Sequence, residues 1–158
     1  MTNYILIKRS ELQQQVDLKN FYLGEAAKRK DADADTLQSS TDDKELFVMF
    51  LRRALNELTA SVALRFSFIK YHITEEFIEI TFETADTPPP HLIPLLKQGI
   101  TDYLANDLAL QWLQLRNPIA VQPYFVLRNG LYENVQQLFA KFFNRNKIRR
   151  RATDLAGI

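Results

Sequence analysis

The sequence contains no cysteine, and this absence excludes several kinds of chemistry at once. A chain without cysteine has no disulfide framework, no thiolate metal site and no thiol nucleophile. It also lacks any run of about 18 apolar residues, so we expect no membrane-spanning helix. The opening stretch M-T-N-Y-I-L-I-K-R-S has no basic region followed by a long apolar core. We therefore expect no secretory signal peptide, and synthesis in the cytoplasm.

The signature motifs of common enzymes are missing as well. No G-x-x-x-x-G-K, G-x-G-x-x-G or G-x-S-x-G segment occurs. His72 and His91 lie in different contexts without HExxH spacing, and we expect structural roles for both. Two carboxylates of a glutamate group could act together in acid–base catalysis, but the spacing of the group favours a position on the solvent-exposed face of a sheet. The group consists of Glu75, Glu76, Glu79 and Glu83. The sequence therefore predicts a protein that is not an enzyme and uses no cofactor, metal or small-molecule substrate.

What the sequence does contain suits one compact domain with arms. It has 158 residues, 46% of them hydrophobic, and only 4 glycines, so few tight turns are expected. The periodicity predicts an α+β fold that is mainly helical, with a small central β-hairpin or strand element at residues 66–83. We expect a polar N-terminal arm with an acidic loop at 1–41, a helical core at 42–146, and a basic tail at 147–158.

Three stretches of the expected core have a helical period. The first begins at Thr41 or Asp42 and carries a stripe with spacings of three and four: Phe47, Leu51, Leu55, Leu58 and Val62. The second has Pro94 in its first turn and ends at Asn117-Pro118. A turn at Asn129-Gly130 precedes the last helix. The residues expected to pack in the core or in a subunit interface are Trp112, Leu113, Leu115, Phe139 and Phe143.

The second of these helices is apolar on more than one side. We therefore expect it to be buried from several directions, in part against another subunit. At the N-terminal end, the sequence predicts a short extended arm at residues 4–8. It also predicts a possible helix N-cap at Ser10 and a short helix at residues 18–30. For residues 66–83 a hairpin turning near 74–76 is favoured over a single strand that follows a longer helix.

The charges are segregated along the chain. Residues 31–45 hold six acids and one lysine, whereas residues 141–151 (K-F-F-N-R-N-K-I-R-R-R) hold six cations and no acid. Asp31, Asp33 and Asp35 have the spacing of a calcium loop, but such a loop needs a glycine where Thr36 stands and a glutamate where Asp42 stands. A solvated acidic loop is therefore the favoured interpretation.

Three interpretations of the basic stretch compete. It could bind nucleic acid through counterion release, lie on a membrane with its phenylalanines inserted, or dock on an acidic neighbour. Its phenylalanines continue the apolar stripe of Leu131, Val135 and Leu138, which favours the core for them and disfavours a membrane. The residues expected to contact another subunit or DNA are Lys147, Arg149, Arg150, Arg151, Asp31, Asp33, Asp35, Asp42 and Asp43.

The second half of the chain resembles a known group of proteins. The segment T-P-P-P-H-L-I-P-L-L-K-Q-G-I-T-D-Y-L-A-N-D-L-A-L-Q-W-L-Q-L follows a strand, and the last helix ends in N-R-N-K-I-R-R-R. This order is similar to that of small structural proteins from the morphogenesis clusters of Bacteroidetes phages and phage-tail-like particles. Residues 108–113 (L-A-L-Q-W-L) and Arg149 to Arg151 carry the resemblance.

The resemblance implies a neck, connector or tail-terminating component that assembles as a ring in a virion or a contractile injection apparatus. Its partners would be copies of itself and neighbouring assembly proteins. A head-to-tail ring contact joins two different surfaces of one protein, and the acidic and basic segments suit such a contact. The alternative is a nucleic-acid-binding module that uses the basic C-terminal helix. A connector around a DNA channel would combine the two, with non-specific DNA contacts.

Overall fold

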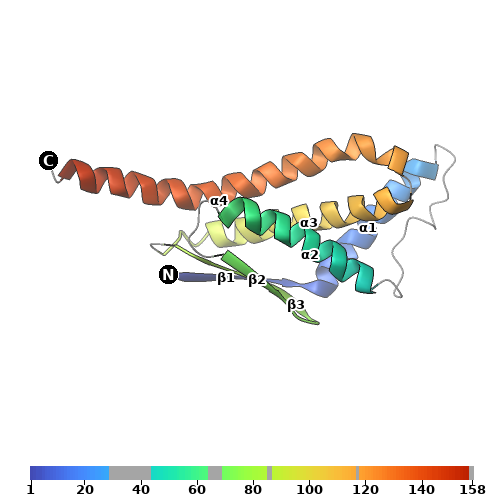
Figure 1. Cartoon of the computed structure of the whole chain (residues 1–158), viewed down its shortest axis with the longest axis horizontal. Helices are drawn as coiled ribbons and strands as arrows, with labels where there is room; N and C mark the ends of the chain where they lie inside the picture. Colours follow the sequence, from blue (N-terminus) through green and yellow to red (C-terminus); the bar gives the residue numbers. More distant parts are fainter. Residues whose placement is uncertain (29–43, 64–68, 85–86, 117, 157–158) are drawn as a thin grey trace.

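The computed structural model describes residues 1–28, 44–63, 69–84, 87–116 and 118–156. Side chains are described as far as Phe21 in the first helix and Lys141 in the last. The elements follow in the order β1 (Thr2–Lys8), α1 (Arg9–Lys28), α2 (Lys44–Ala63), β2 (Ile69–Ile73), β3 (Phe77–Glu83), α3 (Leu92–Arg116), the 3-10 helix η3 (Pro118–Val121) and α4 (Gln122–Ala156). The predicted α+β, mainly helical fold is confirmed (Figure 1).

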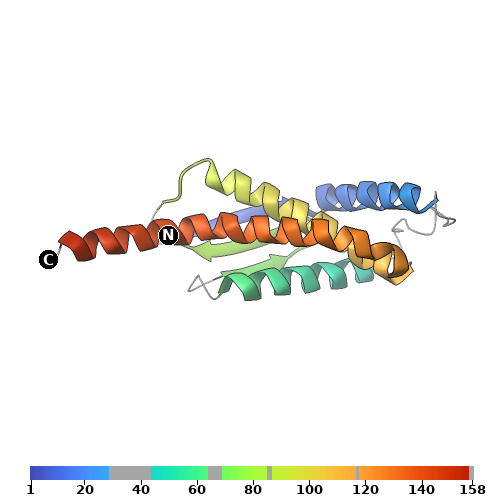
Figure 2. The same cartoon turned by 90° about the horizontal axis from the view of Figure 1, so that it is seen from above.

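The strands form an antiparallel sheet in the order β1-β3-β2. The central strand β3 pairs with β1 from Glu83–Thr2 to Phe77–Lys8, and with β2 along the hairpin. Thr74 closes that hairpin, because its hydroxyl accepts a hydrogen bond from the Phe77 N–H at 2.9 Å. The predicted hairpin with a turn near residues 74–76 is therefore confirmed. The helices lie on one face of this sheet (Figures 1 and 2).

The core lies between the sheet and the helices, with α3 in the middle. Helix α3 contacts α1, α2, α4 and β1, so its broad apolar surface is covered from several directions by the chain itself. The expected stripe of α2 also faces this core, although Phe47 is only partly buried: the buried residues of α2 are Phe50, Leu51, Ala54, Leu55, Leu58 and Val62. The expected bounds of α3, from the turn around Pro94 to Asn117-Pro118, agree with the structure.

In helix α4 the described residues of the common core lie in its first part. Val135, Leu138 and Phe139 are buried in the common core, where the Phe139 ring packs edge-on against Phe82 with centroids 5.5 Å apart. The helix then continues to Ala156. Figures 1 and 2 show that this C-terminal part extends beyond the sheet and the other helices. It forms an arm, and its end lies at the extremity of the molecule.

Three expectations were wrong. The short helix expected at residues 18–30 begins earlier, because α1 spans Arg9–Lys28 and Ser10 lies inside it rather than at its N-cap. Residues 4–8 are not an arm: they belong to β1, and Ile5 and Ile7 are at most 2% exposed. The sequence pattern could not show this, because the pairing strand β3 lies far along the chain. Asn129-Gly130 does not form a turn either, since both residues lie inside α4. A glycine in a helix costs about 1 kcal/mol relative to alanine, and packing on both sides of Gly130 outweighs that cost.

Candidate functional site

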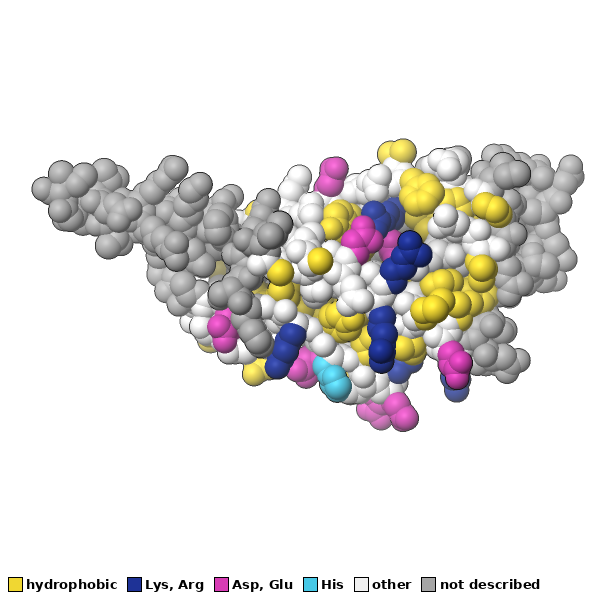
Figure 3. All heavy atoms as spheres, viewed as in Figure 1, with side chains coloured by type: hydrophobic (Ala, Val, Ile, Leu, Met, Phe, Trp, Pro, Cys, Tyr) yellow, Lys and Arg dark blue, Asp and Glu magenta, His cyan; other side chains and the backbone are white. Residues whose placement is uncertain are grey.

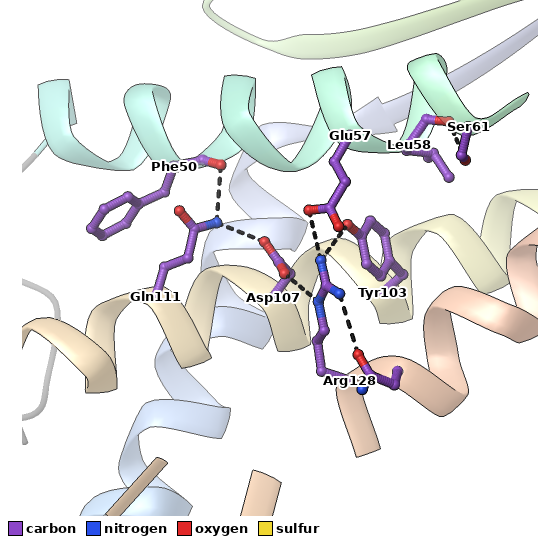
Figure 4. Close-up of polar contacts among 9 residues, drawn as sticks. Phe50, Glu57, Leu58, Ser61, Tyr103, Asp107, Gln111 and Arg128 are labelled. Atoms are coloured by element: carbon purple, nitrogen blue, oxygen red, sulfur yellow. Dashed lines mark hydrogen bonds and ion pairs between the residues drawn. The ribbon is translucent and has the colours of Figure 1, made fainter. Parts of the chain in front are cut away.

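The densest group of polar contacts lies where α4 crosses α2 and α3. It comprises Arg128, Glu57, Asp107, Tyr103 and Gln111, and is called the Arg128 cluster below (Figure 4). The Arg128 guanidinium donates from Nη2 to Glu57 Oε2 at 2.7 Å and from Nε to Asp107 Oδ1 at 2.9 Å. Gln111 Nε2 donates to Asp107 Oδ2 at 2.6 Å and to the Phe50 carbonyl at 3.2 Å. One residue of α4 is thus bonded to both neighbouring helices.

Two aromatic rings accompany the guanidinium. Its central carbon lies 5.7 Å from the ring centroid of Tyr103 and 5.3 Å from that of Tyr132. The two rings are themselves 5.3 Å apart, so their faces and the cation form one group. A cation at this distance from a ring face is attracted by the ring quadrupole. The aromatic contacts therefore hold Arg128 in the orientation that its ion pairs require.

Burial and charge fix the protonation states of this cluster. Burial raises the pKa of Tyr103 above its ordinary value of 10.0, and the negative charges of Asp107 and Glu57 raise it further. Burial lowers the pKa of Arg128, but its hydrogen bonds to Glu57 and Asp107 outweigh that effect and leave it above the ordinary value. At neutral pH Tyr103 is therefore a neutral phenol and Arg128 is a cation.

The Arg128 cluster fixes the position of α4 relative to α2 and α3. Both carboxylate oxygens of Asp107 are engaged, and the residue is 6% exposed. A buried carboxylate is costly unless it is paired, so α4 is held in the register at which Arg128 reaches Asp107. This cluster was not predicted from the sequence. The signal that could have indicated it is Asp107, a charged residue in the mostly apolar stretch L-A-N-D-L-A-L, because a buried charge needs a partner.

The residues predicted for core or interface packing divide between two environments. Trp112, Leu113 and Phe139 are buried within this chain, at 3%, 1% and 1% exposure. Trp112 packs edge-on against Phe50 with ring centroids 6.3 Å apart. Leu115, in contrast, is 60% exposed near the end of α3. The side chain of Phe143 lies outside the described residues, as does that of Phe142.

The residues predicted to contact a neighbour fall where the structure gives no side chains. Lys147, Arg149, Arg150 and Arg151 belong to the extended part of α4, but their side chains lie outside the described residues. The acidic residues lie entirely outside the described ranges: Asp31, Asp33, Asp35, Asp42 and Asp43. The expected meeting of acidic and basic segments therefore stays a prediction.

The remaining candidate residues do not converge. His72 lies on β2 and His91 in the turn before α3, and both are exposed, as are Glu75, Glu76 and Glu83. Among the described residues no three side chains of histidine, aspartate or glutamate come together as a metal ion would require. The helices of the described part also include none that is long and apolar enough to cross a membrane.

An open cleft of about 530 Å³ lies where α1 and α2 begin. Its lining has charges of both signs: Arg9, Ser10, Gln13, Lys44, Phe47 and Glu75. Arg9 makes structural hydrogen bonds to the hairpin turn. Its guanidinium donates to the Thr74 carbonyl at 2.7 Å, and its backbone N–H donates to the Glu76 carbonyl at 2.9 Å. The Arg9 contacts tie the start of α1 to the hairpin turn.

Apolar side chains reach the surface in separate groups, interspersed with charges of both signs (Figure 3). Exposed apolar residues on the two helices on either side of η3 are Leu115, Val126 and Leu127, at 60%, 77% and 52% exposure. On β1, Tyr4 and Leu6 are 60% and 47% exposed.

The chain matches no protein-family model, no curated protein and no solved structure. The resemblance to phage structural proteins therefore stays a prediction.

Proposed function

We propose that the protein is a non-enzymatic structural subunit of a phage or phage-tail-like contractile injection assembly, in which it forms a ring as a neck, connector or terminator component. One observation carries the proposal: the C-terminal part of α4 extends beyond the folded body (Figures 1 and 2). A helix of which one half is anchored in the core and the other half projects is suited to reach a neighbouring subunit.

The opposite end of the molecule supports the same proposal. Figure 1 shows the junction of α3 and α4 at the far end from the C-terminus. The exposed apolar residues Leu115, on α3, and Val126 and Leu127, on α4, lie on either side of this junction in the sequence. A head-to-tail ring needs two different surfaces on one subunit, and the two ends of this molecule differ in this way. The first candidate for the surface that receives the basic helix end is the acidic segment 31–45 of an adjacent copy.

Charge reversal of the basic end tests this proposal. The triple variant Arg149→Glu, Arg150→Glu, Arg151→Glu should lose assembly, because like charges would then meet at the acidic segment. A matched control with the same charge change uses exposed cations of the folded body: Arg52→Glu, Arg53→Glu, Lys97→Glu. Electron microscopy of the purified proteins and sedimentation velocity give the readout. The proposal fails if the unmodified protein stays monomeric at high concentration, with its cognate assembly proteins present.

The second candidate function is nucleic-acid binding, and the projecting helix favours it too. Six cations on residues 141–151 near the end of an extended helix could follow a phosphate backbone. This alternative predicts DNA binding that weakens steeply with salt and is lost on replacing Arg149, Arg150 and Arg151 by alanine. Absence of binding at low salt, measured by fluorescence anisotropy with a duplex and a single strand, would exclude it.

A further inference from the structure

Strand β1 offers an edge that no strand of the described chain covers. It pairs with β3 on one side only, and the order β1-β3-β2 leaves it at the border of the sheet. Natural edge strands are usually protected by proline, a bulge, short length or several charges. β1 has seven residues in unbroken register with β3, has no proline, and carries one charged side chain, Lys8 at its end. Its edge is therefore unusually open to pairing with another strand.

The side chains next to this edge are apolar on both faces of the sheet. Ile5 and Ile7 face the core, whereas Tyr4 and Leu6 point to the outer face and remain 60% and 47% exposed. The outer face is not covered by any helix of the described chain (Figure 1). A partner strand with the same alternation would cover Tyr4 and Leu6 and continue both faces of the sheet.

We propose that the edge of β1 binds β1 of a second copy of this chain in antiparallel orientation, with Ile5 at the centre of the pairing. This register is the one that uses all seven residues of Thr2–Lys8, because Ile5 is the middle residue of the strand. The two sheets then join into one continuous sheet about a twofold axis. The inference goes beyond the proposed function, since it names a contact between identical surfaces that differs from a head-to-tail ring contact.

On the outer face the residues that meet in this register are complementary. Tyr4 of each copy lies beside Leu6 of the other on the outer face, which places an apolar pair on each side of the axis. Lys8 lies beside Thr2 of the other copy, so the two lysines do not face each other. Thr2 is itself paired with Glu83, which puts a carboxylate in the same row as that lysine. On the core face Ile5 lies beside its own counterpart.

Cysteine cross-linking tests the register directly, because the natural chain has no cysteine. Directly opposite residues of antiparallel strands have Cα atoms about 4.5–5.5 Å apart, within the range of a disulfide, whereas positions offset by two residues are about 7–8 Å apart. The double variant Tyr4→Cys, Leu6→Cys should therefore form a disulfide-linked dimer under mild oxidation. Each single variant should cross-link much less efficiently.

The other border of the sheet supplies the matched control pair. Lys70 and His72 occupy the same outer-face rows on β2 as Tyr4 and Leu6 do on β1. The variant Lys70→Cys, His72→Cys should stay uncross-linked at protein concentrations at which the β1 pair reacts. Cross-linking of the β2 pair alone, or equal cross-linking of both pairs, would overturn the proposal.

Sedimentation equilibrium gives a second, independent measurement. Leu6→Lys should raise the dimer dissociation constant at least about tenfold, because a charge replaces an apolar contact on each side of the axis. Leu95→Lys is the matched control, since Leu95 is 49% exposed on α3 and Leu6 is 47% exposed on β1. A monomeric unmodified protein, or identical constants for both variants, would contradict the proposal. The two hypotheses can fail separately. If the Leu6→Lys variant still forms rings, the proposed function stands although the β1 contact is lost. If the β1 cross-link forms but no rings are seen, the β1 contact stands although the proposed function fails.

Discussion

Helix α4 is attached to the rest of the fold by contacts of two different kinds. At Arg128 the contact is polar, with bonds to Glu57 and Asp107. On either side of Arg128 the contacts are apolar: Tyr124 and Phe125 pack on a small buried cluster, and Val135, Leu138 and Phe139 lie in the main core. The apolar contact gains free energy from the area it removes from water, in whatever direction the side chains point. The polar contact requires particular atoms to meet.

The two kinds of contact affect the direction of the C-terminal part of α4 differently. An apolar stripe alone permits a helix to slide or rotate slightly, whereas Arg128 reaches Asp107 in one register only. Breaking a buried ion pair is costly, but replacing both partners by apolar residues is often neutral for stability. We therefore expect the apolar contact to supply most of the stability of α4, and the polar contact to fix the direction in which its C-terminal part projects.

The largest expected effect is at the apolar contact. Phe139→Ala should lower the free energy of unfolding by about 3–5 kcal/mol, because the ring is 1% exposed and packs against Phe82. Urea denaturation followed by circular dichroism measures it. Val126→Ala is the control on the same helix, since Val126 is 77% exposed and its truncation should cost less than about 0.5 kcal/mol. Equal losses in both variants would show that α4 is not anchored through Phe139.

A smaller effect is expected at the polar contact. Arg128→Ala should cost about 2 kcal/mol, less than a fully buried pair, because Glu57 remains partly exposed to water. The double variant Arg128→Met, Asp107→Leu should recover most of this loss, since no buried charge is then left unpaired.

The double variant also tests whether the Arg128 cluster fixes the direction in which the C-terminal part of α4 projects. Its α4 should show faster amide hydrogen exchange near residue 128 and a broader distribution of distances between the helix end and the sheet, measured with paired spin labels. A narrow, unchanged distribution would mean that the apolar contact alone fixes the direction of α4.

Much of the fold followed from periodicity. The stripe from Leu51 to Val62, the helix around Pro94 and the hairpin turn at Thr74 were predictable, because each signal is local and strong. The pairing of β1 was not predictable in this way. A short alternating stretch does not reveal its partner, and the partner β3 follows two helices later along the chain.

The candidate site was predictable only in part. The burial of Trp112 and Phe139 followed from the helical stripes, whereas the exposed position of Leu115 depends on where η3 turns the chain. The Arg128 cluster combines residues from three helices, and no spacing within one segment indicates it. Asn129-Gly130 does not form the turn that its local preference predicts, because packing on either side of it stabilises the helix.

Substitutions at two glycines, Gly99 on α3 and Gly130 on α4, distinguish the effect of helix propensity on stability from the effect of packing. Gly130→Ala should raise the free energy of unfolding by about 0.5–1 kcal/mol, because a Cβ there meets no atom within 4 Å and the unfolded chain loses freedom. Gly99→Ala should be less stable than Gly130→Ala, since its Cβ would lie 2.9 Å from Leu138 Cδ1 and the buried leucine would have to move. Thermal melts of the two variants, measured side by side, check this order. The opposite order would mean that the α3–α4 contact is loosely packed at Gly99.

The smallest effect at neutral pH is expected at Tyr103, and it grows in alkaline solution. Burial, together with the charges of Asp107 and Glu57, raises the pKa of Tyr103 in the folded state above its ordinary value of 10.0. Below pH 10 both the folded and the unfolded chain keep this proton. Above it the unfolded chain loses the proton first, so the stabilising contribution of the protonated phenol declines as pH rises through the folded-state pKa.

Tyr103→Phe removes this group while leaving the ring beside Arg128. At neutral pH it should cost less than about 1 kcal/mol, since the hydroxyl lies 3.5 Å from the guanidinium and makes at most a weak hydrogen bond. Between about pH 9 and about pH 11 the free energy of unfolding should fall less steeply in the variant than in the natural protein. Urea titrations across that range measure both slopes. Parallel slopes would show that the Tyr103 hydroxyl is solvated in the folded state, and that the polar contact of α4 is more open than the distances around Arg128 indicate.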